Sequence, residues 1–210
     1  MIRILIADDH AIVREGLKQI VSREEDMSIA GEAESAETMF RILEHTACDV
    51  IILDISMPGN SGLDALKELK QNYPEIPVLI LSIHSEDQYG IRAISAGASG
   101  FLKKVSAPAE LVTAIRKIVQ GGRYISEPLA EKLADNLAMG KKLPHEFLSD
   151  REYQIMCQIA SGMSVEEIAD YLNISIHTVY SYRTRLLEKM KMRSNVELTR
   201  YVMQNKLIVS

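Results

Sequence analysis

The sequence Ile2-Arg3-Ile4-Leu5-Ile6-Ala7-Asp8-Asp9 is a largely apolar run that stops at two carboxylates. The pattern of an apolar run followed by a polar ligand-type residue recurs three times: Val50–Leu53 before Asp54, Val78–Leu81 before Ser82, and Gly100–Leu102 before Lys103-Lys104. Short continuous runs of Ile, Leu and Val are typical of strands buried on both faces of a parallel sheet. Because ligands bind at the carboxyl ends of such strands, these polar side chains are predicted to meet at one edge.

Segments with helical periodicity alternate with these runs. A weaker strand is predicted at 28–33, and helices at 10–21, 35–44, 63–72, 85–96 and from Ser106 to about Gln120. Gly97 stands where a helix C-terminus favours glycine, and Pro108 fits a first helical turn. Five successive strand–helix units predict an α/β fold with a doubly wound parallel sheet, written (βα)5.

The last 63 residues show no strand pattern. Serine with glutamate three residues later predicts capping boxes at Ser149/Glu152, Ser164/Glu167 and Ser194/Glu197, and Ser175 can cap a further helix. Four helices in this length predict a small all-α domain. The expected organisation is a first domain at 1–120, a linker with a short helix at 121–147, and a second domain at 148–210.

Charge is unevenly distributed between the two predicted domains. The chain of 210 residues carries a net charge of −5, and from Leu148 onward eight basic and seven acidic residues give 8 − 7 = +1, which leaves −6 before it. An acidic first part and a locally basic second part indicate two separate tasks. No apolar stretch reaches the roughly 18 residues of a membrane span, and Cys48 and Cys157 lack metal-like spacing. We expect a cytoplasmic protein with reduced cysteines and no membrane partner.

The predicted acidic edge favours metal-assisted phosphoryl chemistry. Asp8, Asp9 and Asp54 repel one another unless a cation neutralises them, and ligand sets made only of oxygen favour Mg²⁺. One carboxylate can attack phosphorus in line while a lysine balances charge and Ser82 hydrogen-bonds the product. The alternative is ordinary local structure: Asp-Asp can cap a helix, and Asp54 can belong to a turn with Met57-Pro58-Gly59.

Three motifs in order along residues 1–120 resemble the receiver domain of response regulators, a flavodoxin-like fold. They are Ile-Ala-Asp-Asp-His at 6–10, Leu-Asp-Ile-Ser-Met-Pro at 53–58, and Gly-Ala-Ser-Gly-Phe-Leu-Lys-Lys at 97–104. The resemblance implies that Asp54 is the phospho-acceptor, and that Asp8, Asp9 and the backbone carbonyl of Ser56 join it in binding Mg²⁺.

The same resemblance assigns switch roles further along the chain. Ser82 takes the hydroxyl switch position, Lys104 the invariant lysine position and Phe101 the aromatic switch position, while Lys103 is a solvated edge charge. Ser56 and His84 stand where this family varies the lifetime of the phosphoryl group. For His84 the alternative is a surface loop histidine with no chemical role.

The second domain has the spacing of a helix-turn-helix, with a short turn before a longer helix at 175–190. On that helix Val179, Leu186, Leu187 and Met190 are predicted to face inward. The residues left to face outward are Tyr180, Ser181, Arg183, Thr184, Arg185 and Lys189. Basic and hydroxylic side chains on one exposed helix are suited to phosphate and major-groove contacts. The alternative is a solvated face in a protein-interaction bundle.

Leu-Ser-Asp-Arg-Glu at 148–152, Gly-Met-Ser-Val-Glu-Glu-Ile-Ala at 162–169 and Ile-Ser-Ile-His-Thr-Val at 174–179 resemble the LuxR-type helix-turn-helix. With the receiver motifs, this is the layout of the NarL/FixJ response regulators. The resemblance implies base-edge contacts from Tyr180, Ser181 and Thr184, and backbone contacts from Arg183, Arg185 and Lys189. The chain departs from the usual lysine at Tyr180 and the usual histidine at Tyr182, so operator preference does not carry over.

In this family the last helix often pairs two DNA-binding domains. The candidates for such pairing are Val196, Leu198, Thr199 and Val202. The alternative is that these side chains belong to the core of the four-helix bundle.

The expected function is transcription control by a two-component response regulator that is not an enzyme acting on a separate substrate. The expected partners are a sensor histidine kinase, promoter DNA and a second copy in a phosphorylation-dependent homodimer, and the expected cofactor is Mg²⁺. Phosphorylation acts either by dimerisation or by release of the DNA-binding domain. The rival interpretations are a Mg²⁺-dependent phosphohydrolase and an interaction module that binds no DNA.

Overall fold

The computed structural model describes residues 1–57, 62–84, 86–139, 143–205 and 207–208. The chain forms two compact units, Met1–Ala130 and Glu131–Ser210. No helix in these described ranges is long and apolar enough to cross a membrane.

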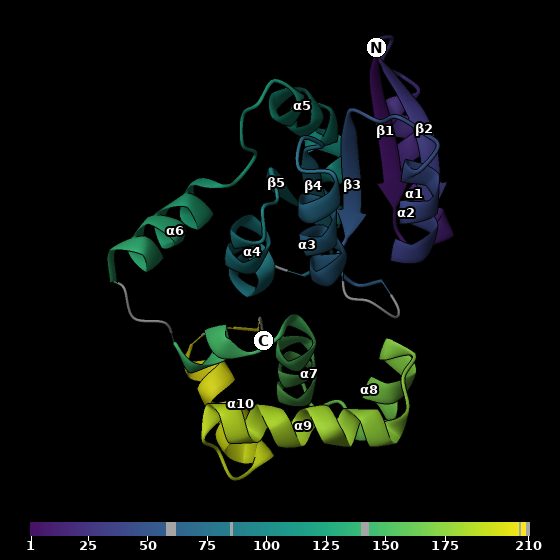
Figure 1. The fold of residues 1–210 in the computed structure, drawn as a ribbon. Coiled ribbons are helices and arrows are strands. Elements are labelled where there is room, and N and C mark those ends of the chain that lie inside the picture. The colour runs from purple at the N-terminus through teal and green to yellow at the C-terminus, as the bar shows by residue number, and fades with distance from the viewer. Residues whose placement is uncertain (58–61, 85, 140–142, 206, 209–210) are drawn as a thin grey trace. The chain divides into compact units, whose positions relative to one another are not determined.

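The first unit is built on a five-stranded sheet whose strands are all parallel. The strands are β1 (Ile2–Ala7), β2 (Met27–Ala33), β3 (Val50–Asp54), β4 (Val78–Ser82) and β5 (Gly100–Lys103). Their order is β2-β1-β3-β4-β5, and Figure 1 shows them side by side in this sequence. This is the flavodoxin-like order of a doubly wound sheet. The predicted fold class is confirmed: every residue of β3 and β4 is buried, as their apolar runs require.

Five helices cover the two faces of the sheet. They are α1 (Ala11–Val21), α2 (Ala36–Leu43), α3 (Gly62–Asn72), α4 (Glu86–Ser95) and α5 (Ala107–Val119). On one face α1 and α5 contact each other and close a core over the sheet, while α3 contacts α4. That core contains Ile4, Ile6, Leu17, Val21, Ile52, Leu79, Leu81, Leu111, Ala114, Ile115 and Ile118. The strand ends are therefore held by a rigid apolar layer.

Local signals at the helix ends are mostly confirmed. Gly97 has φ +102° after α4, a conformation that favours glycine. Ser35 caps α2 by accepting a hydrogen bond from the Thr38 amide. Ser106, where the last helix of this unit was predicted to begin, lies in the short 3₁₀ turn η1 (Lys104–Ser106), and its side chain makes no capping hydrogen bond to α5. The backbone already turns in helical geometry there, so Ser106 is not in the extended conformation that a capping serine adopts.

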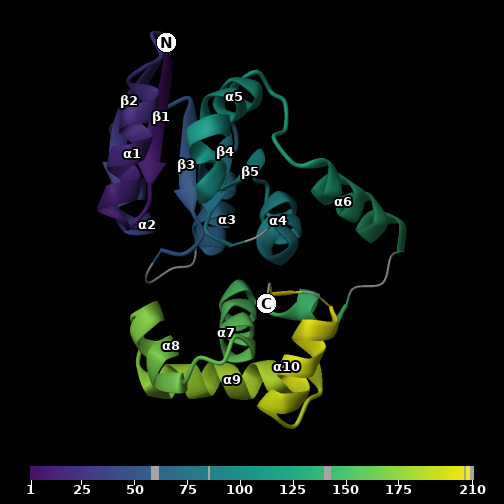
Figure 2. The same cartoon turned by 180° about the vertical axis from the view of Figure 1, so that it is seen from behind.

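The first unit extends past the boundary predicted at 120. The Phe101 amide donates to the Tyr124 carbonyl (2.9 Å) and the Tyr124 amide to the Ser99 carbonyl (3.0 Å), so this segment pairs in parallel with β5. Beyond it, α6 (Glu127–Met139) begins beside α4, as Figure 2 shows, where Leu129 is buried against Gly90. The compact unit thus ends at Ala130; where the functional domain ends stays a prediction.

The second unit is helical. It contains the 3₁₀ turn η2 (Pro144–Phe147), α7 (Asp150–Ala160), α8 (Val165–Leu172), α9 (Ile176–Met190) and α10 (Asn195–Gln204). In Figure 1 α9 runs the length of the unit with α8 near one end and α10 near the other. Helix α7 contacts α8, α9 and α10. The apolar side chains buried in α8, α9 and α10 include Ile168, Val179, Leu186, Leu198 and Val202.

Two of the three predicted capping boxes form. Ser149/Glu152 and Ser164/Glu167 each make both reciprocal hydrogen bonds. The third prediction is wrong in half: Ser194 accepts from the Glu197 amide, but the Glu197 carboxylate accepts from the amide of Arg193, one residue before the cap. The carboxylate still satisfies a free amide at the helix start, so α10 is capped by a variant of the motif.

Candidate functional site

The residues of the predicted acidic edge lie at the carboxyl ends of four strands. Asp8 and Asp9 directly follow β1, Asp54 is the last residue of β3, and Ser82 is the last residue of β4. Lys104 opens the turn after β5. Neighbouring strands in register bring these residues together, as the sequence predicted from the carboxyl ends of parallel strands.

Lys104 joins two buried carboxylates. Its Nζ lies 2.7 Å from Asp8 Oδ2 and 2.8 Å from Asp54 Oδ2. The side chains of Asp8 and Asp54 are 2% and 0% exposed, and that of Lys104 is 12% exposed. The neighbouring Lys103 is exposed. Of the two lysines, the structure therefore brings Lys104 to the carboxylates.

Burial and charge compete within this ion pair. Burial raises the pKa of Asp54 above its ordinary value, and Asp8 adds to this, although Lys104 and the Ser56 amide act in the opposite direction. Burial by itself would lower the pKa of Lys104, but the charges and hydrogen bonds of Asp54 and Asp8 outweigh it, and the pKa is raised. Lys104 therefore stays protonated and supplies the positive charge that keeps a buried carboxylate available.

Backbone amides fix the orientation of three side chains at the edge. The Ser56 amide donates to Asp54 Oδ1 (3.0 Å), the His10 amide to Asp8 Oδ1 (2.9 Å), and the His84 amide to Ser82 Oγ (3.0 Å). Each is a turn closed between residue i and residue i+2 directly after a strand. In the described part of the chain Ser82 does not hydrogen-bond Asp54.

The two remaining predicted switch-region residues are Phe101 and His84. Phe101 is 1% exposed, so its ring lies inside the first unit. The ring of His84 lies 4.9 Å from that of Tyr89, measured between centroids. The predicted turn residues Pro58 and Gly59 lie outside the described residues.

The edge offers ligands suited to a small divalent cation. Ligand atoms of Asp8, Asp9, His10 and Asp54 all lie within 4.8 Å of one another. Three carboxylates and one ammonium leave a deficit of two positive charges, which a divalent cation would balance. Carboxylate oxygens are the ligands that Mg²⁺ prefers, so the residues present fit this ion. The carbonyl of Ser56 stays a predicted fourth ligand.

Two residues at the edge escaped sequence reasoning. His10 joins the carboxylate group: its Nδ1 lies 2.8 Å from Asp9 Oδ1 and 3.3 Å from Asp8 Oδ1. Gly62 opens α3 so close to β3 that a Cβ would stand 2.2 Å from the carbonyl oxygen of Asp54. Adjacency to Asp8-Asp9 was a signal for His10, but nothing local distinguishes Gly62.

The second unit contains the helix-turn-helix that the sequence predicted. Helix α8 ends at Asn173 in the left-handed conformation (φ +51°), and Ser175 caps α9 by accepting from the Thr178 amide. Along α9 the four predicted inward residues, Val179, Leu186, Leu187 and Met190, are all buried. The short turn fixes α9 against α8, as the motif requires.

The predicted DNA-contacting residues differ in their exposure to solvent and in their contacts within the unit. Tyr180 is 49% exposed, and Thr184 and Arg185 are exposed. The hydroxyls of Ser181 and Thr184 donate to carbonyls one turn back, those of His177 and Tyr180. The Arg185 guanidinium lies 5.6 Å from the centre of the Tyr182 ring, within cation–π range.

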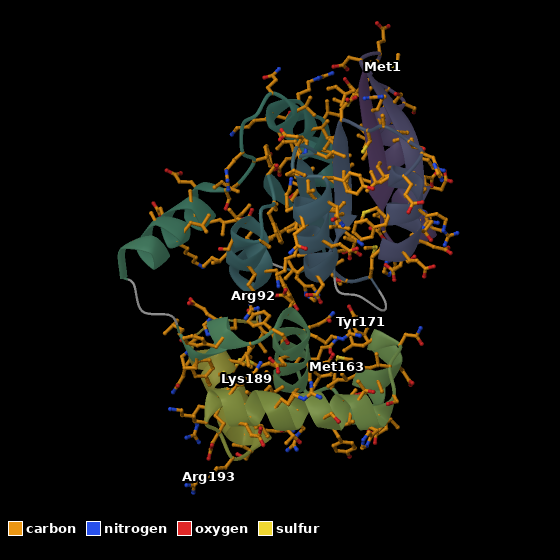
Figure 3. All side chains as sticks on the ribbon, in the orientation of Figure 1. Met1, Arg92, Met163, Tyr171, Lys189 and Arg193 are labelled. Carbon is orange, nitrogen blue, oxygen red and sulfur yellow. The ribbon has the colours of Figure 1, made fainter. Side chains whose placement is uncertain are left out.

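Arg183 and Lys189 are tied within the unit. Arg183 Nε donates to Asn195 Oδ1 (2.8 Å) at the start of α10, and Lys189 Nζ to Glu152 Oε2 (2.7 Å) in α7. Figure 3 labels Lys189 in the last turn of α9 and Arg193 just beyond it. Burial alone would raise the pKa of Glu152, but Lys189 and the capping hydrogen bonds outweigh it and lower that pKa. Both cations thus hold neighbouring helices in place.

The candidates on the last helix divide into two groups. Leu198 and Val202 are fully buried, which supports their alternative interpretation as bundle core. Val196 is 69% exposed, Thr199 is half-buried, and Met203, seven residues after Val196, is 47% exposed. The outer face of α10 therefore carries apolar side chains at helical spacing.

Two family models cover most of the chain. Residues 4–116 match the response regulator receiver domain, and residues 146–202 match the luxR family of bacterial regulatory proteins. The chain is 36% identical to the response regulator UvrY of Escherichia coli K12 over 209 residues, covering 99% of this chain and 96% of that protein. It is 36% identical to the response regulator GacA of Pseudomonas aeruginosa over 200 residues, covering 94% of each.

A solved structure shares the architecture of both units. RcsB from Salmonella enterica serovar Typhimurium, bound to promoter rprA in the presence of the phosphomimetic BeF₃⁻, has a TM-score of 0.65 and 26% sequence identity. The likeness covers 96% of this chain and 98% of that one. The chain belongs to the NarL/FixJ family of two-component response regulators, with a receiver domain followed by a LuxR-type helix-turn-helix DNA-binding domain.

Proposed function

We propose that Asp54 accepts a phosphoryl group from the phosphohistidine of a sensor histidine kinase in a Mg²⁺-dependent reaction, and that this controls binding of promoter DNA. The observation that carries the proposal is the contact of Lys104 with both Asp54 and Asp8 at the carboxyl edge of the sheet. One ammonium between two buried carboxylates leaves this group net negative, so the site calls for a bound cation before it takes the added charge of a phosphoryl group.

The ion expected there is Mg²⁺, with Asp8, Asp9, Asp54 and the carbonyl of Ser56 as the residues that would hold it. When bound, it supplies positive charge to the phosphoryl oxygens.

The reacting group is the Asp54 carboxylate. One of its oxygens attacks phosphorus, the bond from phosphorus to the kinase imidazole breaks, and the imidazole nitrogen keeps the electron pair. The Ser56 amide and Lys104 hold the two carboxylate oxygens in fixed directions beforehand. Such positioning supplies much of the rate in phosphoryl transfer, since little other covalent chemistry is needed.

The product places new acceptor oxygens beside Lys104 and Ser82. The Ser82 hydroxyl accepts a hydrogen bond from the His84 amide, which leaves its own proton available to donate to a phosphoryl oxygen. A shift of Ser82 would move the segment that leads into α4, and Phe101 on the neighbouring strand would follow as the aromatic switch. The charge added at Asp54 thereby stabilises a second arrangement of β4, α4 and β5.

The output is DNA binding in the cytoplasm through α9. Tyr180, Ser181 and Thr184 are proposed to contact base edges and Arg185 the phosphate backbone. Arg183 and Lys189 hydrogen-bond Asn195 and Glu152, so to contact DNA each side chain either reaches the phosphates while it keeps that bond or gives the bond up. A homodimer would present two copies of α9 to paired half-sites, and the apolar outer face of α10 supports pairing at Val196 and Thr199.

The acceptor assignment is tested by incubating the purified protein with acetyl phosphate and Mg²⁺. We expect one phosphoryl group per wild-type chain, none in Asp54→Ala, and wild-type labelling in Asp64→Asn, which removes an exposed carboxylate of α3. Labelling of Asp54→Ala would contradict the assignment. Sustained turnover of a phosphoester, in place of one labelled equivalent, would favour a phosphohydrolase.

A further inference from the structure

His10 brings a nitrogen ligand to the carboxylate edge. His10 is the N-cap residue of α1, yet its side chain makes no capping hydrogen bond. Its amide instead donates to Asp8 Oδ1, which closes a turn and points the residue back toward the carboxylates. The imidazole is 56% exposed, with Nδ1 2.8 Å from Asp9 Oδ1 and 3.3 Å from Asp8 Oδ1.

These distances are those of neighbouring ligands on one ion. In an octahedral site with ligands about 2.1 Å from the ion, adjacent ligand atoms are about 3.0 Å apart and opposite ones about 4.2 Å. The two distances from His10 Nδ1 are near the first value. The four ligand atoms of the group lie within 4.8 Å of one another, a looser limit than a single ion at these bond lengths sets. In the described part of the chain no other group of three or more His, Cys, Asp or Glu side chains meets that limit.

A mixed set of nitrogen and oxygen ligands changes which ion is preferred. Mg²⁺ is a hard cation that takes oxygen, whereas imidazole favours Co²⁺, Ni²⁺, Cu²⁺ and Zn²⁺. His10 is positioned to contribute to the second class of ion and adds little for the first. Asp8, Asp9 and Asp54 serve both.

We propose that His10 is a metal ligand that lets this pocket bind divalent transition-metal ions in competition with Mg²⁺. The inference rests on the proposed Mg²⁺ pocket and adds a nitrogen ligand to it. Because the same three carboxylates hold either ion, occupancy by one excludes the other. The metal present at the phosphorylation site then depends on the balance of available ions.

The experiment measures Co²⁺ and Mg²⁺ affinities of the full-length protein by calorimetry, with Co²⁺ visible absorption as a report of its ligands. For wild type we expect Co²⁺ to displace Mg²⁺. Loss of even an outer-shell partner of a metal ligand typically costs about 10- to 100-fold in affinity. His10→Ala removes a ligand itself, so it should lose at least about tenfold for Co²⁺ while its Mg²⁺ affinity changes less than about twofold. His10→Phe, which keeps a ring at the N-cap, should behave like His10→Ala.

His45→Ala is the matched control, because the His45 side chain is 80% exposed and lies 3.9 Å from the carboxylate of Glu44, away from the acidic edge. It should bind both ions as wild type does. Unchanged Co²⁺ affinity in both His10 variants would overturn the inference, as would an equal loss of Co²⁺ and Mg²⁺. If instead Asp9→Asn leaves Mg²⁺ affinity unchanged, the carboxylate pocket itself is wrong, and the proposed function fails separately from the role of His10.

Discussion

Lys104 shows how one residue sets the chemistry of the edge. Asp8 and Asp54 are nearly inaccessible to water, and a buried carboxylate without a partner is costly. Lys104 contacts both, and the amides of Ser56 and His10 each donate a hydrogen bond to one of their oxygens. The arrangement keeps Asp54 buried and oriented, and it also keeps the region short of positive charge.

Sequence reasoning at this scale succeeded where a residue stands at the end of an apolar run. It found Asp8, Asp54, Ser82 and the pair Lys103-Lys104 because strand ends in a parallel sheet converge, and the resemblance to receiver domains then selected Lys104. It could not find Gly62, because the need for glycine arises from a backbone 2.2 Å from where its Cβ would stand. Such an approach depends on how α3 packs on β3, which no local pattern encodes.

Gly62 gives a prediction about packing. In Gly62→Ala the new methyl group would collide with the Asp54 carbonyl, so backbone has to move, and overpacking of this kind costs about 1–3 kcal/mol of unfolding free energy. Gly16→Ala is the control, since a Cβ there meets nothing within 4 Å. Alanine in a helix interior should stabilise that variant by roughly 0.5–1 kcal/mol. Urea unfolding measures the free energy of unfolding of both variants. A Gly62→Ala variant as stable as the wild type would show that α3 moves to make room for the methyl group at no cost.

At the scale of elements, the strands are held in register by contacts at their starts as well as their ends. Arg3 in β1 makes a two-point contact with Asp49, which directly precedes β3. The Asp49 carboxylate also accepts from the Arg3 amide. The pair therefore fixes how β1 and β3 enter the sheet, at the end opposite the acidic edge.

This pair predicts a dependence of stability on pH. Hydrogen bonds from Arg3 lower the pKa of Asp49 to about 2 in the folded chain, against about 3.9 when unfolded. A lowered pKa stabilises the fold above the unfolded value, and the contribution is lost as pH falls from about 4 toward about 2. The difference in unfolding free energy between wild type and Asp49→Asn should be constant within experimental error from pH 5 to 8. It should shrink below about pH 4. A difference that grows on acidification would contradict the pairing.

The linker was the element that the sequence described least well. Tyr124 pairs with β5 through two backbone hydrogen bonds, and its hydroxyl donates to Glu110 at 2.6 Å. Ser126 hydrogen-bonds Glu86 at the start of α4. A single residue that pairs with a strand shows no periodicity to detect, so this docking becomes visible only in the tertiary structure.

The docked linker predicts a cost for removing Leu129. Its side chain is 2% exposed against α4, and truncation of a buried leucine costs about 2–5 kcal/mol. Leu129→Ala should lower the unfolding free energy of the first unit by an amount in that range, measured by urea unfolding of the full chain. Leu143→Ala, at a position 46% exposed, should leave it unchanged. Wild-type stability of Leu129→Ala would mean that the linker is not part of the first unit.

At the scale of the whole molecule, acidic chemistry and basic recognition are assigned to separate units. Composition anticipated this division, since net charge is −6 before Leu148 and +1 after it. It could not distinguish basic residues that hold helices together from those that face solvent. Lys189 and Arg183 belong to the first kind and Arg185 to the second.

Arg185 therefore gives the sharpest prediction for DNA binding. Loss of one phosphate contact weakens binding across sequences and reduces the slope of log affinity against log salt by about 1. Arg185→Ala should show this change in titrations of promoter fragments at several salt concentrations. Arg41→Ala removes an exposed arginine of α2 and should keep the wild-type slope. Absence of any salt-dependent binding to promoter fragments by the wild type would favour an interaction module over a DNA-binding regulator.

The central claim is that the phosphoryl group resides on Asp54, and the most direct measurement identifies the modified side chain itself. Borohydride reduces an aspartyl phosphate to homoserine, so phosphorylated protein can be reduced, digested and sequenced by mass spectrometry. We expect homoserine at position 54 only, after labelling by acetyl phosphate with Mg²⁺. Homoserine at Asp8 or Asp9 with Asp54 intact would contradict it.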